Sequence, residues 1–249
     1  MAMRASNRSS NWDALVDEAH AWQVCPEDLA AGMPCVRGLS WLSPDERARY
    51  EQFPTQRQQH DYLTARVLCR ATLSRYATVH PSEWQFEKGA YGKPRIAAPV
   101  GFESLHFNLT HAEGLMICLV SRAGDVGIDT EKTSSNIDGA LIARHFFSRL
   151  EQARFGSLPV HQRPAWFFAQ WVVKEAYLKG TGRGLDTPER VTVEWGEDGQ
   201  PVAIGSWQLF LYHPSPNHVA AAAVRPRGAF AASSPWLKTE HFLQTDIPG

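Results

Sequence analysis

The order of apolar and polar residues along the chain predicts its strands. An unbroken apolar run at residues 115–120, LMICLV, is typical of a buried strand, and residues 126–129, VGID, predict the next one. Residues 105–109 predict a strand before these, followed by a turn at residues 110–114. Three further segments near the end of the chain predict strands, with a GEDG hairpin turn after the first: residues 191–195, 207–212 and 218–224.

Helices are indicated by capping residues as well as by apolar spacing. Ser43 followed by Pro44 predicts one helix start, since Ser caps N-termini and Pro fits the first turn. Thr55 and Ser148 each precede a Gln or Glu by three positions, which is the capping-box spacing and predicts two more starts. The remaining expected helices span residues 137–145 and 164–180.

Both halves of the chain combine helices with mostly antiparallel strands, which predicts the α+β class. We expect two domains, residues 1–123 and residues 124–249. The polar tail after residue 233 is expected to fray at its end.

Composition narrows the functional classes. The 249 residues are 43% hydrophobic and 20% charged with a net charge of −1, which indicates a globular protein that binds neither nucleic acid nor membrane by bulk charge. No apolar run approaches the roughly 20 residues of a membrane span, and residues 1–10 lack the apolar segment of a secretory signal. The cysteines form no C-x-x-C pair, which predicts buried, reduced thiols in a cytoplasmic protein: Cys25, Cys35, Cys69 and Cys118.

Three acidic residues stand in apolar surroundings. Asp129 and Glu131 are two positions apart on an expected strand, so they share one face, about 7 Å apart. Glu175 lies in the middle of the helix at residues 164–180, which is apolar on nearly every side, and Lys179 follows one turn later. Simpler interpretations exist: the first two acids can form a solvated strand edge, and the last pair an internal salt bridge.

A divalent cation would relieve the repulsion among these three carboxylates. Oxygen ligands favour Mg²⁺, Mn²⁺ or Ca²⁺ over zinc, and Mg²⁺ commonly binds phosphate oxygens of a substrate as well. Lys88 and Lys93 bracket a turn-rich loop that can offer N–H groups and an ammonium to a phosphate, unless it is an ordinary solvated turn. Thr110 and His111 add a hydroxyl and an imidazole, although a lone His is often structural.

Together these motifs resemble a known family. The segment VGID-x-E, followed by W-x-x-K-E-A-x-x-K, is similar to the signature of the Sfp-type 4′-phosphopantetheinyl transferases. The motifs G-K-P, F-N-x-T-H and F-F-S-x-x-E, at residues 92–94, 107–111 and 146–151, resemble that family in the same order. Thr110 replaces the usual Ser but keeps a hydroxyl. The match covers residues 43–185.

The resemblance implies a fold and a reaction. The fold would be two similar α+β halves related by a pseudo-twofold axis, in a monomer with coenzyme A (CoA) in the cleft between them. The reaction would be that of a holo-carrier-protein synthase: the 4′-phosphopantetheine arm of CoA passes to a serine of an apo acyl or peptidyl carrier protein, and 3′,5′-ADP is released. Such an enzyme serves fatty-acid or secondary-metabolite biosynthesis.

The resemblance also implies roles for particular residues. Asp129, Glu131 and Glu175 would hold Mg²⁺, with Mn²⁺ as an alternative, on the CoA pyrophosphate. Glu175 would accept the serine proton, and Lys179 and His111 would assist catalysis. The residues expected to bind CoA are Arg49, Lys88, Gly92, Lys93, Pro94, Asn108, Thr110, His111, Lys174 and Lys179.

The expected carrier partner is partly acidic and docks on apolar residues, with residues 145–150 and 158–166 as candidate surfaces. Two other functions remain open. One is a metal-dependent phosphodiesterase or nuclease, which the near-neutral charge disfavours because such enzymes carry a basic stripe. The other is a non-enzymatic module that binds CoA or a partner.

Overall fold

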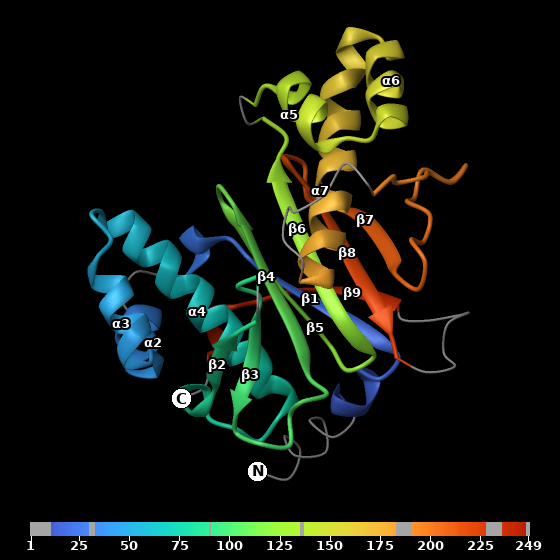
Figure 1. Cartoon of the computed structure of the whole chain (residues 1–249). Coiled ribbons are helices and arrows are strands. Elements are labelled where there is room, and N and C mark those ends of the chain that lie inside the picture. The colour runs from blue at the N-terminus through green and yellow to red at the C-terminus, as the bar shows by residue number, and fades with distance from the viewer. Residues whose placement is uncertain are drawn as a thin grey trace.

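The computed structural model describes residues 11–29, 33–89, 91–134, 137–182, 191–227 and 236–247. Two sheets form the centre of the molecule, with one long helix packed on each and smaller helices at the two ends (Figure 1). The helices are α2 (Met33–Trp41), α3 (Pro44–Glu51), α4 (Gln56–Tyr76), α5 (Gly139–Phe146), α6 (Arg149–Ser157) and α7 (Arg163–Thr181). Single 3-10 turns are η1 (Pro26–Asp28), η2 (Pro81–Glu83), η3 (Val160–Gln162) and η5 (Gln244–Asp246).

The strands confirm the α+β class with predominantly antiparallel pairing. The N-terminal sheet has the order β4-β5-β1-β9 and the C-terminal sheet the order β6-β8-β7, while β2 and β3 form a separate ribbon. β1 and β9 are the parallel pair. The strand bounds are β1 (Glu18–Val24), β2 (Gln85–Lys88), β3 (Pro94–Ala98), β4 (His106–Ala112), β5 (Leu115–Ser121), β6 (Gly124–Lys132), β7 (Gln208–Ser215), β8 (His218–Pro226) and β9 (Trp236–His241). The pseudo-twofold relation between the halves stays a prediction.

The capping residues act as predicted. The side chains of Ser43, Thr55 and Ser148 each accept a hydrogen bond from the backbone N–H three residues later, at the starts of α3, α4 and α6. The C-terminus of α7 differs from the prediction: the helix runs one residue past Gly180, and Gly182 caps it in the left-handed conformation with φ of 66°.

The segment at residues 191–195 was predicted to be a strand and forms none. Two of its backbone groups bond to side chains instead: Val191 O accepts from Lys174, and Val193 N donates to Glu151. Only Trp195 makes a bridge, to Pro201, around the predicted turn, where Gly196 N donates to Gln200 O at 2.8 Å.

Several strands were missed by the sequence pattern. β1, β2, β3 and β9 lack a long apolar run, and β9 lies in the polar tail after residue 233. β4 extends to Ala112, which shortens the predicted turn and places Thr110 and His111 inside a strand. The fraying predicted for the last residues concerns 248–249, outside the described residues.

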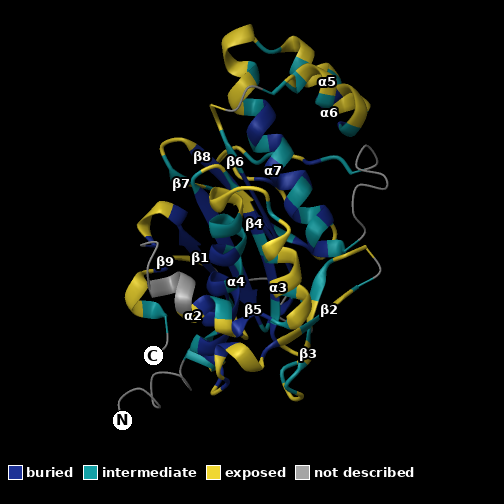
Figure 2. Ribbon diagram, turned by 90° about the vertical axis from the view of Figure 1, so that its left-hand side faces the viewer, coloured by how far each residue is buried: buried dark blue, intermediate teal, exposed yellow. Residues whose placement is uncertain are grey.

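Three apolar clusters hold the molecule together. One fills the space between α4 and the N-terminal sheet, and a second lies between α7 and the C-terminal sheet. The third joins the two sheets, with Ala19 and Ile117 on one side and Ile128 and Ala222 on the other. Figure 2 shows this buried interior, with exposed residues on the outer helices.

The cysteines bear on the predicted redox state. Cys25, Cys69 and Cys118 are free thiols. Cys69 and Cys118 are buried as predicted, whereas Cys25 is half-buried next to Glu27. The side chain of Cys35 lies outside the described part of the chain.

Candidate functional site

The edge strands β4 and β6 lie next to each other, one from each sheet, and side chains join them. Asn108 Oδ1 accepts from Ile128 N at 2.9 Å, and His106 Nδ1 lies 3.4 Å from Asp125 Oδ1. A cavity of 450 Å³ opens along this junction, with walls from β4, β6 and α7. Its lining residues are Leu109, Thr110, His111, Asp129, Thr130, Glu131, Trp171, Glu175 and Lys179. All three predicted metal-binding carboxylates therefore face one space.

Two glycines explain how α7 comes so close to β6. A Cβ atom on Gly127 would lie 2.0 Å from Ala176 O and 2.3 Å from Gly180 N, so only glycine permits this backbone contact. Gly180 in turn packs against the ring of Trp207, which a Cβ would meet at 2.5 Å. Because the two backbones touch, side chains one turn apart on α7 reach the face of β6 that carries the carboxylates.

Lys179 is bonded directly to the β6 carboxylate. Its Nζ donates to Asp129 Oδ1 at 2.5 Å and to Thr110 Oγ1 at 3.3 Å. Thr110 Oγ1 donates to the same Asp129 oxygen at 3.2 Å. The hydroxyl, the ammonium and the carboxylate thus form one polar cluster across the two sheets and α7.

The cavity disfavours the charged form of its carboxyl groups. Burial raises the pKa of Asp129, with Lys179 opposing the rise. Burial and the neighbouring Asp129 raise the pKa of Glu131. Burial, Asp129 and Glu131 together raise the pKa of Glu175 to about 7, again opposed by Lys179. Three acids that repel one another are a setting that a further cation would stabilise.

The donor atoms fit a hard divalent cation. Among the described residues, Asp129 Oδ2 and Glu175 Oε1 are buried without a hydrogen-bond partner, which is costly unless a ligand completes them. Carboxylate oxygens are the ligands that Mg²⁺ and Mn²⁺ prefer. In the described part of the chain, no three acidic, His or Cys side chains are already arranged closely enough to enclose a metal ion. Lys179 holds one of the Asp129 oxygens that such an ion would use.

Trp171 lines the cavity, although sequence analysis assigned it no role. Its Nε1 donates to Glu131 Oε1 at 3.2 Å, and its ring stacks on Phe167. Its signal was the first position of the W-x-x-K-E motif, one turn before Glu175. This hydrogen bond fixes the direction of the Glu131 carboxylate, so Trp171 orients Glu131 in the cavity.

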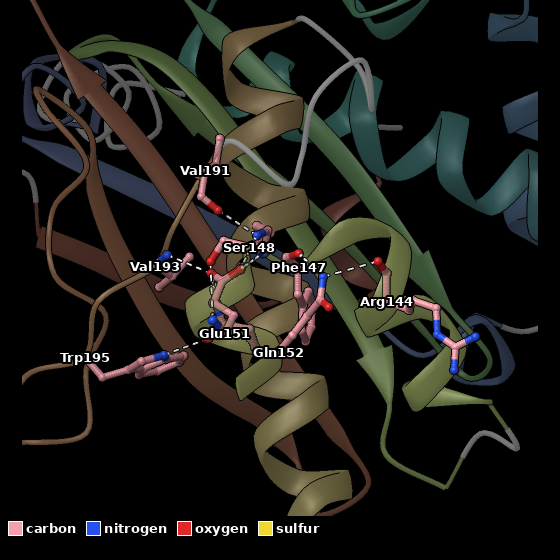
Figure 3. A network of polar contacts seen from close by, with 10 residues as sticks. Arg144, Phe147, Ser148, Glu151, Gln152, Val191, Val193 and Trp195 are labelled. Carbon is pink, nitrogen blue, oxygen red and sulfur yellow. Dashed lines mark hydrogen bonds and ion pairs between the residues drawn. The ribbon is translucent and has the colours of Figure 1, made fainter. Parts of the chain in front are cut away.

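Lys174 does not face this cavity, which corrects the prediction that it binds CoA. Its side chain is 1% exposed, and Nζ donates to Glu151 Oε2 and to Val191 O, both at 2.6 Å. Figure 3 shows the network around Glu151, which also accepts from Ser148 N, Val193 N and Gln170 Nε2. The F-F-S-x-x-E motif therefore supplies a buried counter-charge for Lys174.

Lys93 lies away from the cavity of the carboxylates, and its expected binding to CoA stays a prediction. It lines a separate cavity of 570 Å³, together with its loop neighbour Pro94. Its Nζ donates to Gly180 O at 2.7 Å and Val126 O at 2.9 Å, which ties the β2–β3 hairpin to α7 and β6. Gly92, with φ of 80°, makes the turn that directs this side chain. Burial lowers the pKa of Lys93 to about 8.

The remaining predicted residues divide between the cavity and other positions. His111 is exposed and lines the cavity. Asn108 is buried and committed to the bond with Ile128. Arg49 is exposed on α3 and packs over the ring of Phe53, and Lys88 is exposed at the end of β2. Neither of these two cations lines the cavity of the carboxylates.

Comparison with known proteins adds an independent line of support. The profile of the 4′-phosphopantetheinyl transferase superfamily matches residues 125–224, and that of the 4′-phosphopantetheinyl transferase N-terminal region matches residues 21–123. The 4′-phosphopantetheinyl transferase HetI of Nostoc sp. is 33% identical over 216 residues, which are 86% of this chain and 90% of the relative. The 4′-phosphopantetheinyl transferase Sfp of Bacillus subtilis is 31% identical over 165 residues, 66% of this chain and 71% of the relative.

A likeness among solved structures is more distant. The holo-[acyl-carrier-protein] synthase of Thermotoga maritima shares 22% identity over 42% of this chain and 64% of its own, with a TM-score of 0.33, too low to establish a shared fold. Each helix in the described residues is too short or too polar to cross a lipid bilayer.

Proposed function

This chain belongs to the 4′-phosphopantetheinyl transferase superfamily, and we propose that it transfers the phosphopantetheine arm of CoA to a serine of an apo acyl or peptidyl carrier protein. The observation that carries the proposal is the convergence of Asp129, Glu131, Glu175 and Lys179 on one cavity. Lys179 and a divalent cation held by the three acids can bind a pyrophosphate, because this reaction depends on positioning and charge neutralisation.

The residues of the cavity can account for each part of the reaction. The carrier serine oxygen attacks the phosphorus that bears the pantetheine arm, and the bond from this phosphorus to the bridging pyrophosphate oxygen breaks. The released product is 3′,5′-ADP. Glu175, whose Oε1 is buried without a hydrogen-bond partner among the described residues, takes the serine proton. Lys179 offsets the charge that develops on the leaving oxygens, with His111 at the rim of the cavity as a second donor.

The metal is part of this proposal. Asp129, Glu131 and Glu175 would hold Mg²⁺ or Mn²⁺, as the unpartnered oxygens of Asp129 and Glu175 support. A bound divalent cation would supply charge neutralisation at the pyrophosphate. Trp171 keeps Glu131 oriented toward the cavity, and Thr110 keeps Asp129 in place.

The two halves take different parts in the proposal. A division into residues 1–123 and 124–249 is supported by the two family profiles, which meet at residues 123–125. The cavity lies across this division, because β4 belongs to the first half and β6 and α7 to the second. We propose that the enzyme acts as a cytoplasmic monomer and that CoA spans both halves.

The carrier protein is proposed to dock on the helices α5, α6 and the start of α7. Leu141, Leu150 and Val160 are 50%, 74% and 75% exposed there, next to a cavity of 400 Å³ with apolar walls. Exposed arginines surround them, which suits an acidic partner: Arg144, Arg149 and Arg154. Phe147 of the predicted segment at residues 145–150 is fully buried and belongs to the core instead.

Variants of this surface separate docking from CoA binding. Leu150→Glu places a charge of the wrong sign on the apolar patch, so the KM for the carrier should rise while the KM for CoA stays unchanged. Val100→Glu is a matched control, since Val100 is 83% exposed in a loop far along the chain from this surface. Equal effects of both variants would contradict docking on these helices.

Mass spectrometry tests the activity itself. An apo carrier protein incubated with the enzyme, CoA and Mg²⁺ should gain the mass of one phosphopantetheine group, and 3′,5′-ADP should accumulate in equal amount. A plasmid incubated with Mg²⁺ tests the nuclease alternative. Binding of CoA with no mass gain on any of several carriers would support the non-enzymatic module and contradict the proposal.

A further inference from the structure

The bond between Lys179 and Asp129 raises the question of what this lysine does before substrate arrives. Its ammonium lies 2.5 Å from Asp129 Oδ1, the carboxylate that is 5% exposed at the back of the cavity. The Lys179 side chain itself is 34% exposed, so its outer part borders open space. The lysine thus places a positive charge among three acids, with part of its side chain open to solvent.

This arrangement opposes the entry of a second cation. A divalent ion that used Asp129 would lie within a few ångströms of the ammonium, and like charges at that distance repel strongly in a partly buried site. The same ion would have to compete for an oxygen that already accepts from both Lys179 and Thr110. Asp129 Oδ2 and Glu175 Oε1 lie near this oxygen without a hydrogen-bond partner, so Lys179 satisfies only part of the carboxylate cluster.

A phosphate group would remove this conflict. An ammonium transfers readily from a carboxylate to a phosphate oxygen, because both are strong anionic acceptors. Lys179 has the exposed stem that such a movement needs, whereas Lys174, buried on another side of α7, does not. Once the ammonium is drawn away, Asp129 regains both oxygens.

We propose that Lys179 is an internal counter-ion that occupies Asp129 in the substrate-free protein, opposes divalent-cation binding, and releases the carboxylate when a pyrophosphate draws it away. Divalent cation and pyrophosphate therefore bind with positive cooperativity. This inference rests on the proposed function, because it concerns the same site. It adds an order to the assembly of that site: the metal binds weakly alone and tightly with the phosphates.

Binding of Mn²⁺ to the purified full chain, without CoA, tests this directly. Free Mn²⁺ is measured by its electron paramagnetic resonance signal for the wild type and for Lys179→Met, which keeps the length of the side chain and removes its charge. The variant should bind Mn²⁺ about tenfold more tightly, the size of a typical coupling between two sites. Lys132→Met is the matched control: it removes a cation from the end of β6, where Lys132 pairs with Glu113 at 3.2 Å, and should leave Mn²⁺ affinity nearly unchanged.

A second measurement uses the wild type alone, so the inference stays testable if the variant does not fold. Inorganic pyrophosphate should tighten Mn²⁺ binding to the wild type about tenfold, after correction for the Mn²⁺–pyrophosphate complex measured without protein. Equal or weaker Mn²⁺ binding by a folded Lys179→Met, or no gain from pyrophosphate in the wild type, would overturn the inference. Neither result requires turnover, so a failure here is distinct from a failure to modify carrier proteins.

Discussion

Lys174 and Lys179 are five positions apart on α7 and point about 140° away from each other, so one helix serves two separate purposes. Lys174 is enclosed with Glu151, Gln170 and the segment at residues 191–195, where it holds the C-terminal half together. Lys179 reaches the cavity between the sheets. Both lysines were predicted to lie near phosphate because they share one motif. The ion-pair partner of Lys174, Glu151, lies 23 residues away in the chain, so the motif alone does not reveal it.

Replacement of Lys174 should therefore affect stability rather than CoA binding. Lys174→Met leaves Glu151 as a buried charge without its cation, which costs about 3–5 kcal/mol of the free energy of unfolding. Urea titration measures the loss, and calorimetry on the folded protein should find an unchanged affinity for CoA. Lys132→Met is the control and should change stability by less than about 0.5 kcal/mol. A stable Lys174→Met variant with weakened CoA binding would contradict this assignment.

Lys93 gives the fold a dependence on pH. Its pKa is lowered from 10.5 to about 8 because burial disfavours the ammonium. Between these pH values the unfolded chain binds more protons than the folded one, so the free energy of unfolding rises with pH. The stability of the wild type relative to Lys93→Met should accordingly increase from about pH 8 to about pH 10.5. Thermal or urea unfolding across this range measures it.

Lys88→Met serves as the control for this prediction, since Lys88 is exposed on the same hairpin. This variant removes an ammonium from the hairpin without removing a buried one. A constant difference between the wild type and Lys93→Met would mean that the ammonium is not buried in solution.

Among the elements, the best predicted are those with local signals. Caps at Ser43, Thr55 and Ser148 located three helices, because a cap depends on a few neighbouring residues. β1 and β9 were missed because their parallel pairing brings together segments from opposite ends of the chain. The false strand at residues 191–195 has strand-like residues, but the side chains of Glu151 and Lys174 bond to two of its backbone groups.

The candidate site follows the same rule. The alternation along β6 and the helical spacing from Glu175 to Lys179 made it possible to predict which acids share a face. That the strand and the helix meet depends on backbone contact at Gly127, which spacing alone does not reveal. The same limit applies to Lys93 and Asn108: their bonds to the backbone of β6 could not be predicted from spacing, and their expected contact with CoA stays a prediction.

Gly127 should be intolerant of even a methyl group. In Gly127→Ala the new Cβ would meet Ala176 O at 2.0 Å, so α7 must move away from β6. We expect a loss of about 2 kcal/mol or more of stability and a larger fall in kcat than in CoA affinity, because the distance between Glu175 and Asp129 changes. Urea unfolding and steady-state kinetics measure the two effects.

Gly156→Ala is the matched substitution in a neighbouring helix. A Cβ on Gly156 meets nothing within 4 Å, and alanine favours a helix by up to about 1 kcal/mol over glycine. This variant should be as stable as the wild type or more so, with an unchanged affinity for CoA. Similar losses of stability and kcat in both variants would contradict a specific role for the backbone contact at Gly127.

At the scale of the whole molecule, the two sheets are joined by a shared core rather than by a linker. The faces that meet carry small and branched residues, among them Ala19 and Ala21 of β1 and Ala220 and Ala222 of β8. Because these faces are closely packed, unfolding of one half would expose the apolar face of the other half to water. The cavity at β4 and β6 depends on the same contact.

The chain should consequently unfold as one cooperative unit despite its two halves. Tryptophan fluorescence and far-ultraviolet circular dichroism should give coincident urea transitions, since residues of both halves lose their contacts together. Two separated transitions, or a stable fragment of residues 124–249 alone, would show that the shared core contributes little.

The central claim is that the carboxylates and Lys179 of the cavity carry out phosphopantetheine transfer. Its most direct test is the rate at which Glu175→Gln modifies an apo carrier protein with CoA and Mg²⁺, followed by intact mass. We expect a folded variant that still binds CoA and transfers at least about a hundredfold more slowly than the wild type, while Glu113→Gln, at an exposed acid on the neighbouring turn, transfers normally. Transfer by Glu175→Gln at nearly the wild-type rate would contradict the account.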